Sequence, residues 1–162
     1  MDNAKIERKY MAHYINAKLP GAPADVYIRI GRDLEEYSPS LGAQIDKTSN
    51  ILGETSVKIS SYEKQGSVEP LYAERGDPLF ERLQGIIDGS LALDDVVTDV
   101  VEVKLWEPQS GGGYPAVREK VFIEVTSYGG DTTGYQIPFN IHYTGQKTNG
   151  AFDVTAGAFT AD

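Results

Sequence analysis

Apolar and polar residues alternate along much of this 162-residue chain, and a period of two predicts β-strands. Five runs show it: "DVYIRIG", "SVKIS", "VVTDVVEVKLW", "VFIEVTSY" and "GYQIPFNIHYTG". One face of each run is expected to meet a core and the other to meet water or a partner. In the second run, Val57 and Ile59 are predicted to face the core, and Lys58 and Ser60 to face away. Pro138 in the last run indicates an edge strand or a bulge, because proline cannot donate to a strand ladder.

Glycine-rich connections separate these runs. "QSGGGYP" and "YGGDTTG" are typical of strand-to-strand connections, and Asn149-Gly150 suits a tight hairpin turn. Short strands joined by such turns predict a mainly β fold, namely a β-sandwich or barrel of two packed antiparallel sheets.

One helix is predicted over residues 77–88. Asp77 is suited to cap its first turn, and Pro78 occupies the favoured first helical position. Asp88-Gly89 then provides a stop signal. The apolar residues recur at helical spacing and are expected to cover one sheet or an open end of a barrel. They are Leu79, Phe80, Leu83, Ile86 and Ile87.

Residues 32–53 lack sustained periodicity and are predicted to form a long loop between two strands. Loops of about twenty residues are uncommon in compact domains unless they have a function or are disordered. This one is too apolar for a disordered linker, so we expect it to pack either on its own domain or on a neighbouring copy. Its apolar residues are Leu34, Tyr37, Leu41, Ile45, Ile51 and Leu52.

Composition narrows the function classes. The chain has no cysteine, which excludes disulfides and thiolate chemistry, and no run of about 18 apolar residues that would indicate a membrane span. A net charge of −9 argues against a conventional nucleic-acid binder. Residues 1–20 are different, with four basic and two acidic residues and no signal-peptide pattern. This segment is either a frayed terminus or a basic arm that docks on the acidic body of another copy.

Enzymatic chemistry has little support in the sequence, and we expect no catalytic residue, cofactor or metal. His13 and His142 lie in different segments, and His142 is on the polar face of its run. The pairs Glu35-Glu36 and Asp94-Asp95 lack the ligand spacing of a calcium loop. "SGGGY" lacks the Lys-Ser/Thr of a phosphate-binding loop, and no serine occurs in a Gly-x-Ser-x-Gly setting.

Two stretches carry a family resemblance: "NILGETSVKISSYEKQGSVEPLYAERGDPLFERLQGIID" and "SYGGDTTGYQIPFNIHYTG". In the order of their features, they resemble the tail tube (major tail) proteins of long-tailed bacteriophages. The likeness is greatest to proteins from prophages of Gram-positive bacteria. It covers roughly residues 25–155.

This resemblance implies a single domain over residues 1–162 with a structural role. Subunits of that family form hexameric rings that stack into a hollow tube, through which DNA leaves the capsid. By position, residues 32–53 match the family's loop that bridges successive rings, and residues 1–24 and 150–162 would be terminal arms. The matching loop positions are Asp33, Leu34, Tyr37, Leu41, Ile45, Asn50, Ile51 and Leu52.

The implied partners are further copies of the chain, a tape-measure protein, a tail terminator and passing double-stranded DNA, with no membrane insertion. The implied location is the virion, with assembly in the cytoplasm of the host bacterium. Strand parity offers candidates for the surface that lines the channel. They are Lys58, Ser60, Glu69, Glu102 and Lys104.

Three alternatives stay open from the sequence. The chain would also suit the tube of a contractile tail or phage-tail-like bacteriocin, or a single-ring terminator or connector. A more remote alternative is a β-barrel that binds a small molecule.

Overall fold

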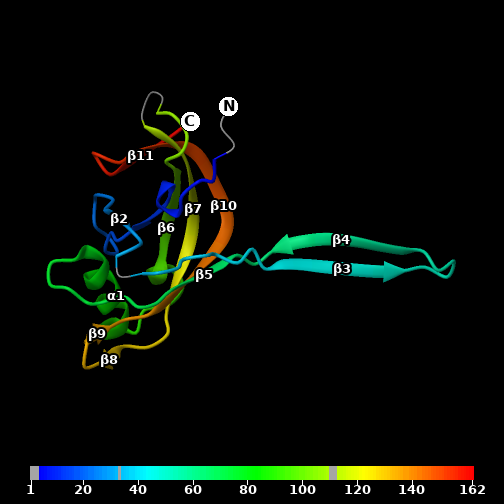
Figure 1. Cartoon of the computed structure of the whole chain (residues 1–162). Coiled ribbons are helices and arrows are strands. Elements are labelled where there is room, and N and C mark those ends of the chain that lie inside the picture. Colours follow the sequence, from blue (N-terminus) through cyan, green and yellow to red (C-terminus); the bar gives the residue numbers. More distant parts are fainter. Residues whose placement is uncertain (1–3, 33, 110–112) are drawn as a thin grey trace.

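The protein is mainly β, as the alternating pattern predicts. The computed structural model describes residues 4–32, 34–109 and 113–162. Among the described residues, strands account for 49% and helices for 12%, with one α-helix. A curled antiparallel sheet forms the body, and a separate two-stranded hairpin projects far out from it (Figure 1).

The main sheet has seven strands, with β11, β10, β7, β6, β1 and β2 in that spatial order. The edge of β10 that faces away from β7 is shared, because its first half pairs with β5 and its second half with β11. The strands are β1 (Met11–Asn16), β2 (Tyr27–Arg29), β5 (Gln65–Val68), β6 (Val97–Lys104), β7 (Tyr114–Val125), β10 (Phe139–Asp153) and β11 (Ala158–Ala161).

Two smaller sheets and two short turns complete the described structure. The projecting hairpin consists of β3 (Ala43–Ser49) and β4 (Thr55–Tyr62). The "YGGDTTG" connection forms a small hairpin of β8 (Gly129–Asp131) and β9 (Gly134–Gln136), as predicted. Single 3₁₀ turns, η1 (Arg8–Tyr10) and η2 (Leu93–Val96), precede β1 and β6.

An irregularity in the β7–β10 pair contributes to the curl of the sheet. Its register shifts between Tyr143 and Lys147, where Gly145 has a φ of +86°. The Gly145 N–H donates to Glu119 Oε2 across the pair at 3.0 Å. Irregularities of this kind bend a strand and increase its local twist, and β10 curves along its length (Figure 1).

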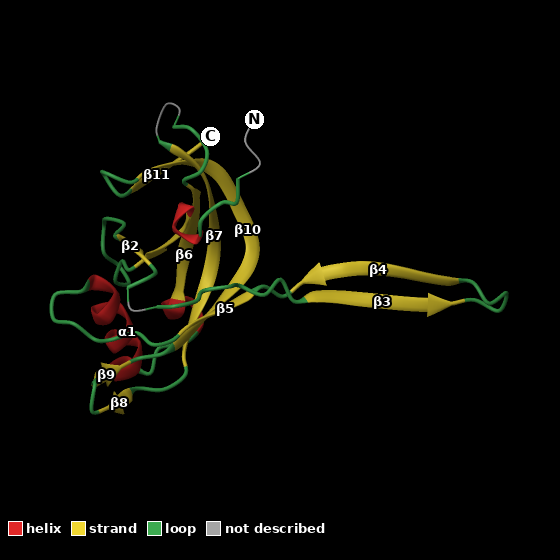
Figure 2. Cartoon of the chain, in the orientation of Figure 1, coloured by secondary structure: helices red, strands yellow, loops and turns green. Residues whose placement is uncertain are grey.

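The predicted helix is confirmed as α1 (Pro78–Gly89). Asp77 is its N-cap, and its carboxylate accepts the Leu79 N–H at 3.0 Å. Three residues of the predicted stripe, Leu79, Leu83 and Ile86, are buried, while Phe80 and Ile87 pack at the margin of the same cluster. Figure 2 shows α1 and the projecting hairpin on opposite sides of the curled sheet in this view. Among the described residues, no helix is long and apolar enough to cross a membrane.

The buried side chains form two hydrophobic clusters. The larger one joins α1 to the sheet and contains Leu83, Ile137, Phe139 and Ile141, all essentially inaccessible to water. The smaller one is centred on Phe152, whose ring lies 4.4 Å from that of Tyr14 between centroids. The alternating faces predicted for "VVTDVVEVKLW" and "GYQIPFNIHYTG" supply residues to these two clusters.

Part of each predicted terminal arm lies in the main sheet. Residues 11–16 form β1, between β6 and β2, and residues 158–161 form β11 on the edge of β10. The run "MAHYIN" is short and not strictly alternating, so its burial on both faces was not visible as a strand pattern. Residues 11–16 are therefore neither a frayed end nor a free arm.

One turn prediction and one strand prediction were wrong. Asn149-Gly150 lies inside β10 and is not a hairpin turn. A Cβ at position 150 would come 2.2 Å from the Thr160 carbonyl oxygen, so glycine is needed there for the close approach of β11. Pro138 lies between β9 and β10 and belongs to neither strand, so it marks a break in the predicted run and not the edge strand or bulge expected there.

Candidate assembly interface

The β3–β4 hairpin is the most exposed element of the described structure. Every residue from 43 to 62 is exposed, and β3 and β4 make their contacts almost entirely with each other. A two-stranded hairpin alone is at best marginally stable in water. The described residues leave both of its faces uncovered.

The hairpin has an apolar face and a polar face. Paired residues of an antiparallel ladder share a face, so Ile45 and Ile59, which are partners, lie together. Val57, opposite Lys47, and Tyr62, opposite Ala43, extend the same face. The other face carries the pairs Gln44–Ser61, Asp46–Lys58 and Thr48–Ser56.

A tight turn presents two further apolar side chains at the tip. The Asn50 side-chain oxygen accepts the N–H groups of Leu52 and Glu54 at 2.9 and 3.0 Å. Gly53 adopts a φ of +81°, which glycine allows at little cost. Ile51 and Leu52 therefore point outward from an ordered turn, and the exposure of Ile51 is complete.

The root of the hairpin is fastened to the body through Tyr37. Its hydroxyl forms a 2.6 Å hydrogen bond with the hydroxyl of Tyr143 in β10, and its ring meets that of His13 edge-on at 4.9 Å. A Cβ at position 66 would come 2.4 Å from the Tyr37 hydroxyl, so Gly66 is what lets the phenol lie against β5. The segment that leads into the hairpin is thus packed on its own domain.

A charged cluster fastens the other side of the root. Lys64 Nζ lies 3.3 Å from Glu119 Oε1 and 3.9 Å from Glu102 Oε2. The same ammonium group lies 4.3 Å from the centroid of the Tyr143 ring. Glu119 is buried, and its second oxygen accepts the Gly145 N–H. A buried carboxylate with a cation and an N–H donor is well satisfied.

Titration of this cluster follows from its contacts. Hydrogen bonding with His13, whose Nε2 lies 3.3 Å away, lowers the pKa of the Glu102 carboxyl, and the charge of Lys64 lowers it further. Burial raises the pKa of Tyr37 to about 12 and raises the pKa of Tyr143 as well. Both phenols therefore remain protonated at neutral pH and keep their mutual hydrogen bond.

The predicted loop residues divide into two groups. Leu34 and Tyr37 pack on the domain's own core, whereas Leu41, Ile45, Asn50, Ile51 and Leu52 are exposed along the hairpin and its approach. Asp33 lies outside the described residues. The first third of this segment therefore packs on its own domain, which is one of the two alternatives, and the remainder projects from the body. Packing on a neighbouring copy stays a prediction.

The predicted lumen candidates do not share one surface. Lys58 and Ser60 lie on β4 in the hairpin, and Glu69 is exposed after β5. Glu102 and Lys104 lie on β6, where Glu102 belongs to the root cluster.

The sequence placed Val57 and Ile59 in the core, which is wrong. They lie on the exposed hairpin, because the strand pairs with residues 43–49 and not with the main sheet. The sequence feature that could have revealed the hairpin is the turn sequence "NILG" between two strand-like segments. Residues 43–49, "AQIDKTS", are predicted as part of a loop because residues 32–53 lack sustained periodicity.

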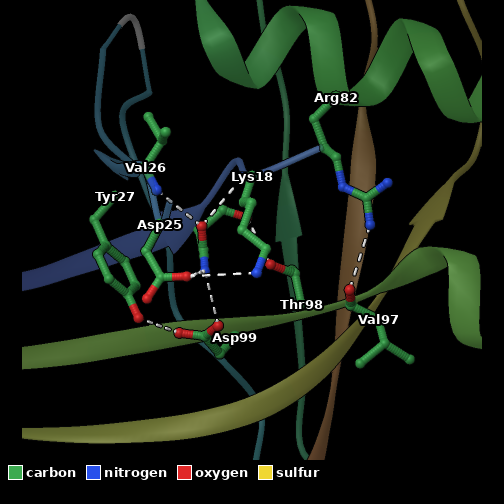
Figure 3. Close-up of polar contacts among 9 residues, drawn as sticks. Lys18, Asp25, Val26, Tyr27, Arg82, Val97, Thr98 and Asp99 are labelled. Atoms are coloured by element: carbon green, nitrogen blue, oxygen red, sulfur yellow. Dashed lines mark hydrogen bonds and ion pairs between the residues drawn. The ribbon is translucent and has the colours of Figure 1, made fainter. Parts of the chain in front are cut away.

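A second polar cluster lies between β1, β2 and β6 (Figure 3). Asn16 Nδ2 donates to Asp25 at 3.0 Å and to Asp99 at 3.1 Å, and its side-chain oxygen accepts two backbone N–H groups. Tyr27 donates to Asp99 at 2.6 Å. With all four of its hydrogen bonds made, the Asn16 amide ties the loop after β1 to the sheet and is not free for chemistry.

The described residues offer no cluster of metal-ligating side chains. They contain no group of three or more histidine or acidic side chains suited to hold a metal ion. His142 forms an exposed pair with Glu124, with 2.9 Å between Nε2 and Oε1, consistent with the polar strand face predicted for it.

No protein-family model matches this chain, and a search of curated proteins found no match to it. The resemblance to tail tube proteins stays a prediction, and the geometry of the hairpin is what supports a function.

Proposed function

We propose that this chain is a structural subunit that assembles with copies of itself into the tail tube of a long-tailed bacteriophage. The observation that carries the proposal is the projecting β3–β4 hairpin, which has an apolar face and no partner for it within the described chain. A neighbouring copy supplies what the hairpin lacks. The mainly β fold with one α-helix is compatible with the β-sandwich or barrel of that family.

The hairpin bridges successive rings in this proposal. Its apolar face and its tip dock on a copy in the next ring, while the anchored root sets the angle at which it leaves the body. Rigid anchoring lowers the entropic cost of docking, because the root is already ordered before contact.

Exposed strand edges provide the second type of contact. β2 and β11 each leave one edge of the main sheet unpaired within the described chain, and β5 does so beyond its bridge between Gln65 and Ser40. Such edges are an aggregation hazard in a monomer and become an assembly device when each pairs with the next subunit. Six copies joined in this way would close a ring.

The charge of the chain suits a conduit for DNA. With a net charge of −9, the wall of the tube would repel phosphates at close range, so that DNA passes without adhering. We place the lining on the polar hairpin face, which includes Lys58. Glu69, Glu102 and Lys104 lie on other surfaces, and Glu102 is engaged in the root cluster. The tape-measure protein and the tail terminator would meet the tube in the virion.

Replacement of the hairpin tests this function. Gly42 and Glu63 are already joined by a 3.0 Å hydrogen bond at its root, so residues 43–62 can be exchanged for an Asn-Gly turn without separating the flanking segments. Negative-stain microscopy should show long hollow tubes for the full chain and none for the variant. Circular dichroism and thermal unfolding serve to confirm that the variant is folded.

Several outcomes would contradict the proposal. Tubes of normal length from the folded variant would show that the hairpin does not bridge rings. Single rings from the full chain would favour a terminator or connector, and a monomer at high concentration would exclude self-assembly. A contractile tail would use the same tube with an added sheath.

A further inference from the structure

A cleft of about 550 Å³ lies beside the start of β1 and carries an excess of positive charge. Arg8, Lys9, Arg29 and Arg32 line it, and Glu35 is the single acidic residue among its described lining residues. Met11, Ile30 and Leu34 supply apolar lining. We call this set of residues the basic cleft. Such a concentration of cations is notable in a chain with a net charge of −9.

Two guanidinium groups of the basic cleft have no carboxylate partner among the described residues. Arg8 donates only to the backbone carbonyls of Met11 and Tyr37, the latter at 2.9 Å, and Arg29 donates to the carbonyl of Lys9 at 2.7 Å. Lys9 and Arg32 pair instead with Glu7 and Glu74. Backbone contacts therefore hold Arg8 and Arg29 in place while their charge stays available to an external anion.

A complementary feature lies at the 3₁₀ turn η2. Leu93 is 83% exposed and has a φ of +55°, a conformation that bulky residues rarely adopt. Asp94 and Asp95 follow it, and neither carboxylate makes an ion pair or side-chain hydrogen bond with a described residue. We call Leu93, Asp94 and Asp95 the acidic knob.

The acidic knob is held rigidly by a buried arginine. Arg82 of α1 is 2% exposed, and its Nη2 donates to the carbonyls of Asp95 at 2.9 Å and Val97 at 3.3 Å. Figure 3 shows this side chain reaching from the helix to Val97. An apolar group flanked by two carboxylates is thus presented in a fixed geometry, which lowers the entropic cost of binding.

The two features lie at opposite ends of β6. The acidic knob immediately precedes Val97, the first residue of the strand, whereas Met11 of the basic cleft pairs with Lys104, its last residue. Eight strand residues place Val97 roughly 25 Å from the Met11 end of the cleft. Arg29, opposite Tyr14, lies at the level of Val101, about half that distance from Val97. One molecule therefore cannot join them to each other, but two molecules can.

We infer that the acidic knob of one copy docks into the basic cleft of another, with Asp94 and Asp95 facing Arg8 and Arg29 and Leu93 on the apolar lining. A contact between unlike surfaces repeats head to tail, and it closes into a ring or continues as a filament. The inference deepens the proposed function, since it names a second contact of the same assembly besides the hairpin.

Disulfide trapping tests the contact directly, because the chain contains no cysteine of its own. The double variant Asp94→Cys/Arg29→Cys should yield a ladder of covalent dimers, trimers and longer species under mild oxidation. Either single variant should give no ladder. Asp88→Cys/Arg29→Cys, with the first cysteine moved to the end of α1, is the matched control and should stay largely monomeric.

Charge reversal provides an independent test by sedimentation. Asp94→Lys/Asp95→Lys should weaken self-association about tenfold or more at low salt, because close interfacial charge pairs are strongly coupled. Combining it with Arg8→Glu/Arg29→Glu in one chain should restore association. An unchanged assembly in the first variant, or a failure of the folded combined variant to recover, would overturn the contact.

The hairpin-replacement variant separates this inference from the proposed function. A cysteine ladder that persists without the hairpin supports the knob-and-cleft contact even if no tube forms. Tubes from the full chain with no ladder would refute this contact and leave the tube intact. Loss of duplex DNA binding in Arg8→Glu/Arg29→Glu, with no ladder in the cysteine variant, would assign the cleft to phosphates and overturn the inference.

Discussion

The apolar face of the hairpin gives the most direct quantitative prediction. Replacing Ile45, Val57 and Ile59 together by threonine keeps three β-branched residues, which suit a strand, and removes most of the apolar surface. Full burial of a valine or isoleucine side chain relative to exposure contributes about 1.5–3 kcal/mol. These three are 57%, 59% and 54% exposed in the isolated chain. Docking therefore recovers roughly half, or about 1 kcal/mol per residue and about 3 kcal/mol in total.

The loss of this docking free energy should weaken assembly and leave the folding of the monomer nearly unchanged. Since 1.4 kcal/mol corresponds to a tenfold change, the critical concentration for polymerisation should rise about 100-fold. The free energy of unfolding of the monomer should change by less than about 0.5 kcal/mol, because surface substitutions of this kind cost little. Light scattering against protein concentration measures the first quantity, and guanidinium titration below the assembly threshold measures the second.

A matched triple variant on the polar face is the control. Gln44→Ala, Thr48→Ala and Ser56→Ala alter the same hairpin without touching its apolar face, and should shift the critical concentration less than about threefold. Equal shifts for the two triple variants would refute the assignment of the apolar face as the docking surface. No shift in either would refute the role of the hairpin in assembly.

Two further predictions concern the root of the hairpin. Tyr37→Phe leaves the Tyr143 hydroxyl without its 2.6 Å partner and should lower the free energy of unfolding by about 1–3 kcal/mol in urea titration. Adding Tyr143→Phe should recover part of that loss. A strictly additive loss in the double variant would contradict the pairing. The lowered pKa of Glu102 means that its stabilising contribution is present above the ordinary carboxyl pKa near 4.5 and disappears as the pH falls below it. Thermal unfolding of the wild type between pH 5 and 3 should therefore weaken more steeply than that of Glu102→Gln, and equal slopes would rule out the coupling.

Predictions that rest on local signals agree with the structure. The helix at 77–88 has its cap, its proline and its apolar stripe within one short segment, so neighbouring residues suffice to specify it. The "YGGDTTG" hairpin is specified in the same way, with Asp131 accepting the Thr133 N–H at 2.9 Å across the turn.

Predictions that depend on strand partners agree less well. "SVKIS" alternates as a core strand does, yet the period of two does not say whether the apolar face meets the body or a separate molecule. The Asn149-Gly150 pair has turn composition but lies mid-strand, where β11 approaches its backbone. A contact between residues distant in sequence decided both cases.

The sequence by itself determined a mainly β chain with one capped helix, because alternation, caps and turn chemistry act over a few residues. Only the tertiary structure decided that residues 43–62 stand away from the body, that β1 lies within the sheet, and that the acidic knob and the basic cleft occupy opposite ends of β6. The physical reason is that burial and proximity depend on two segments at once. The pattern within one segment indicates whether it forms a helix or a strand, but not which other segment it packs against.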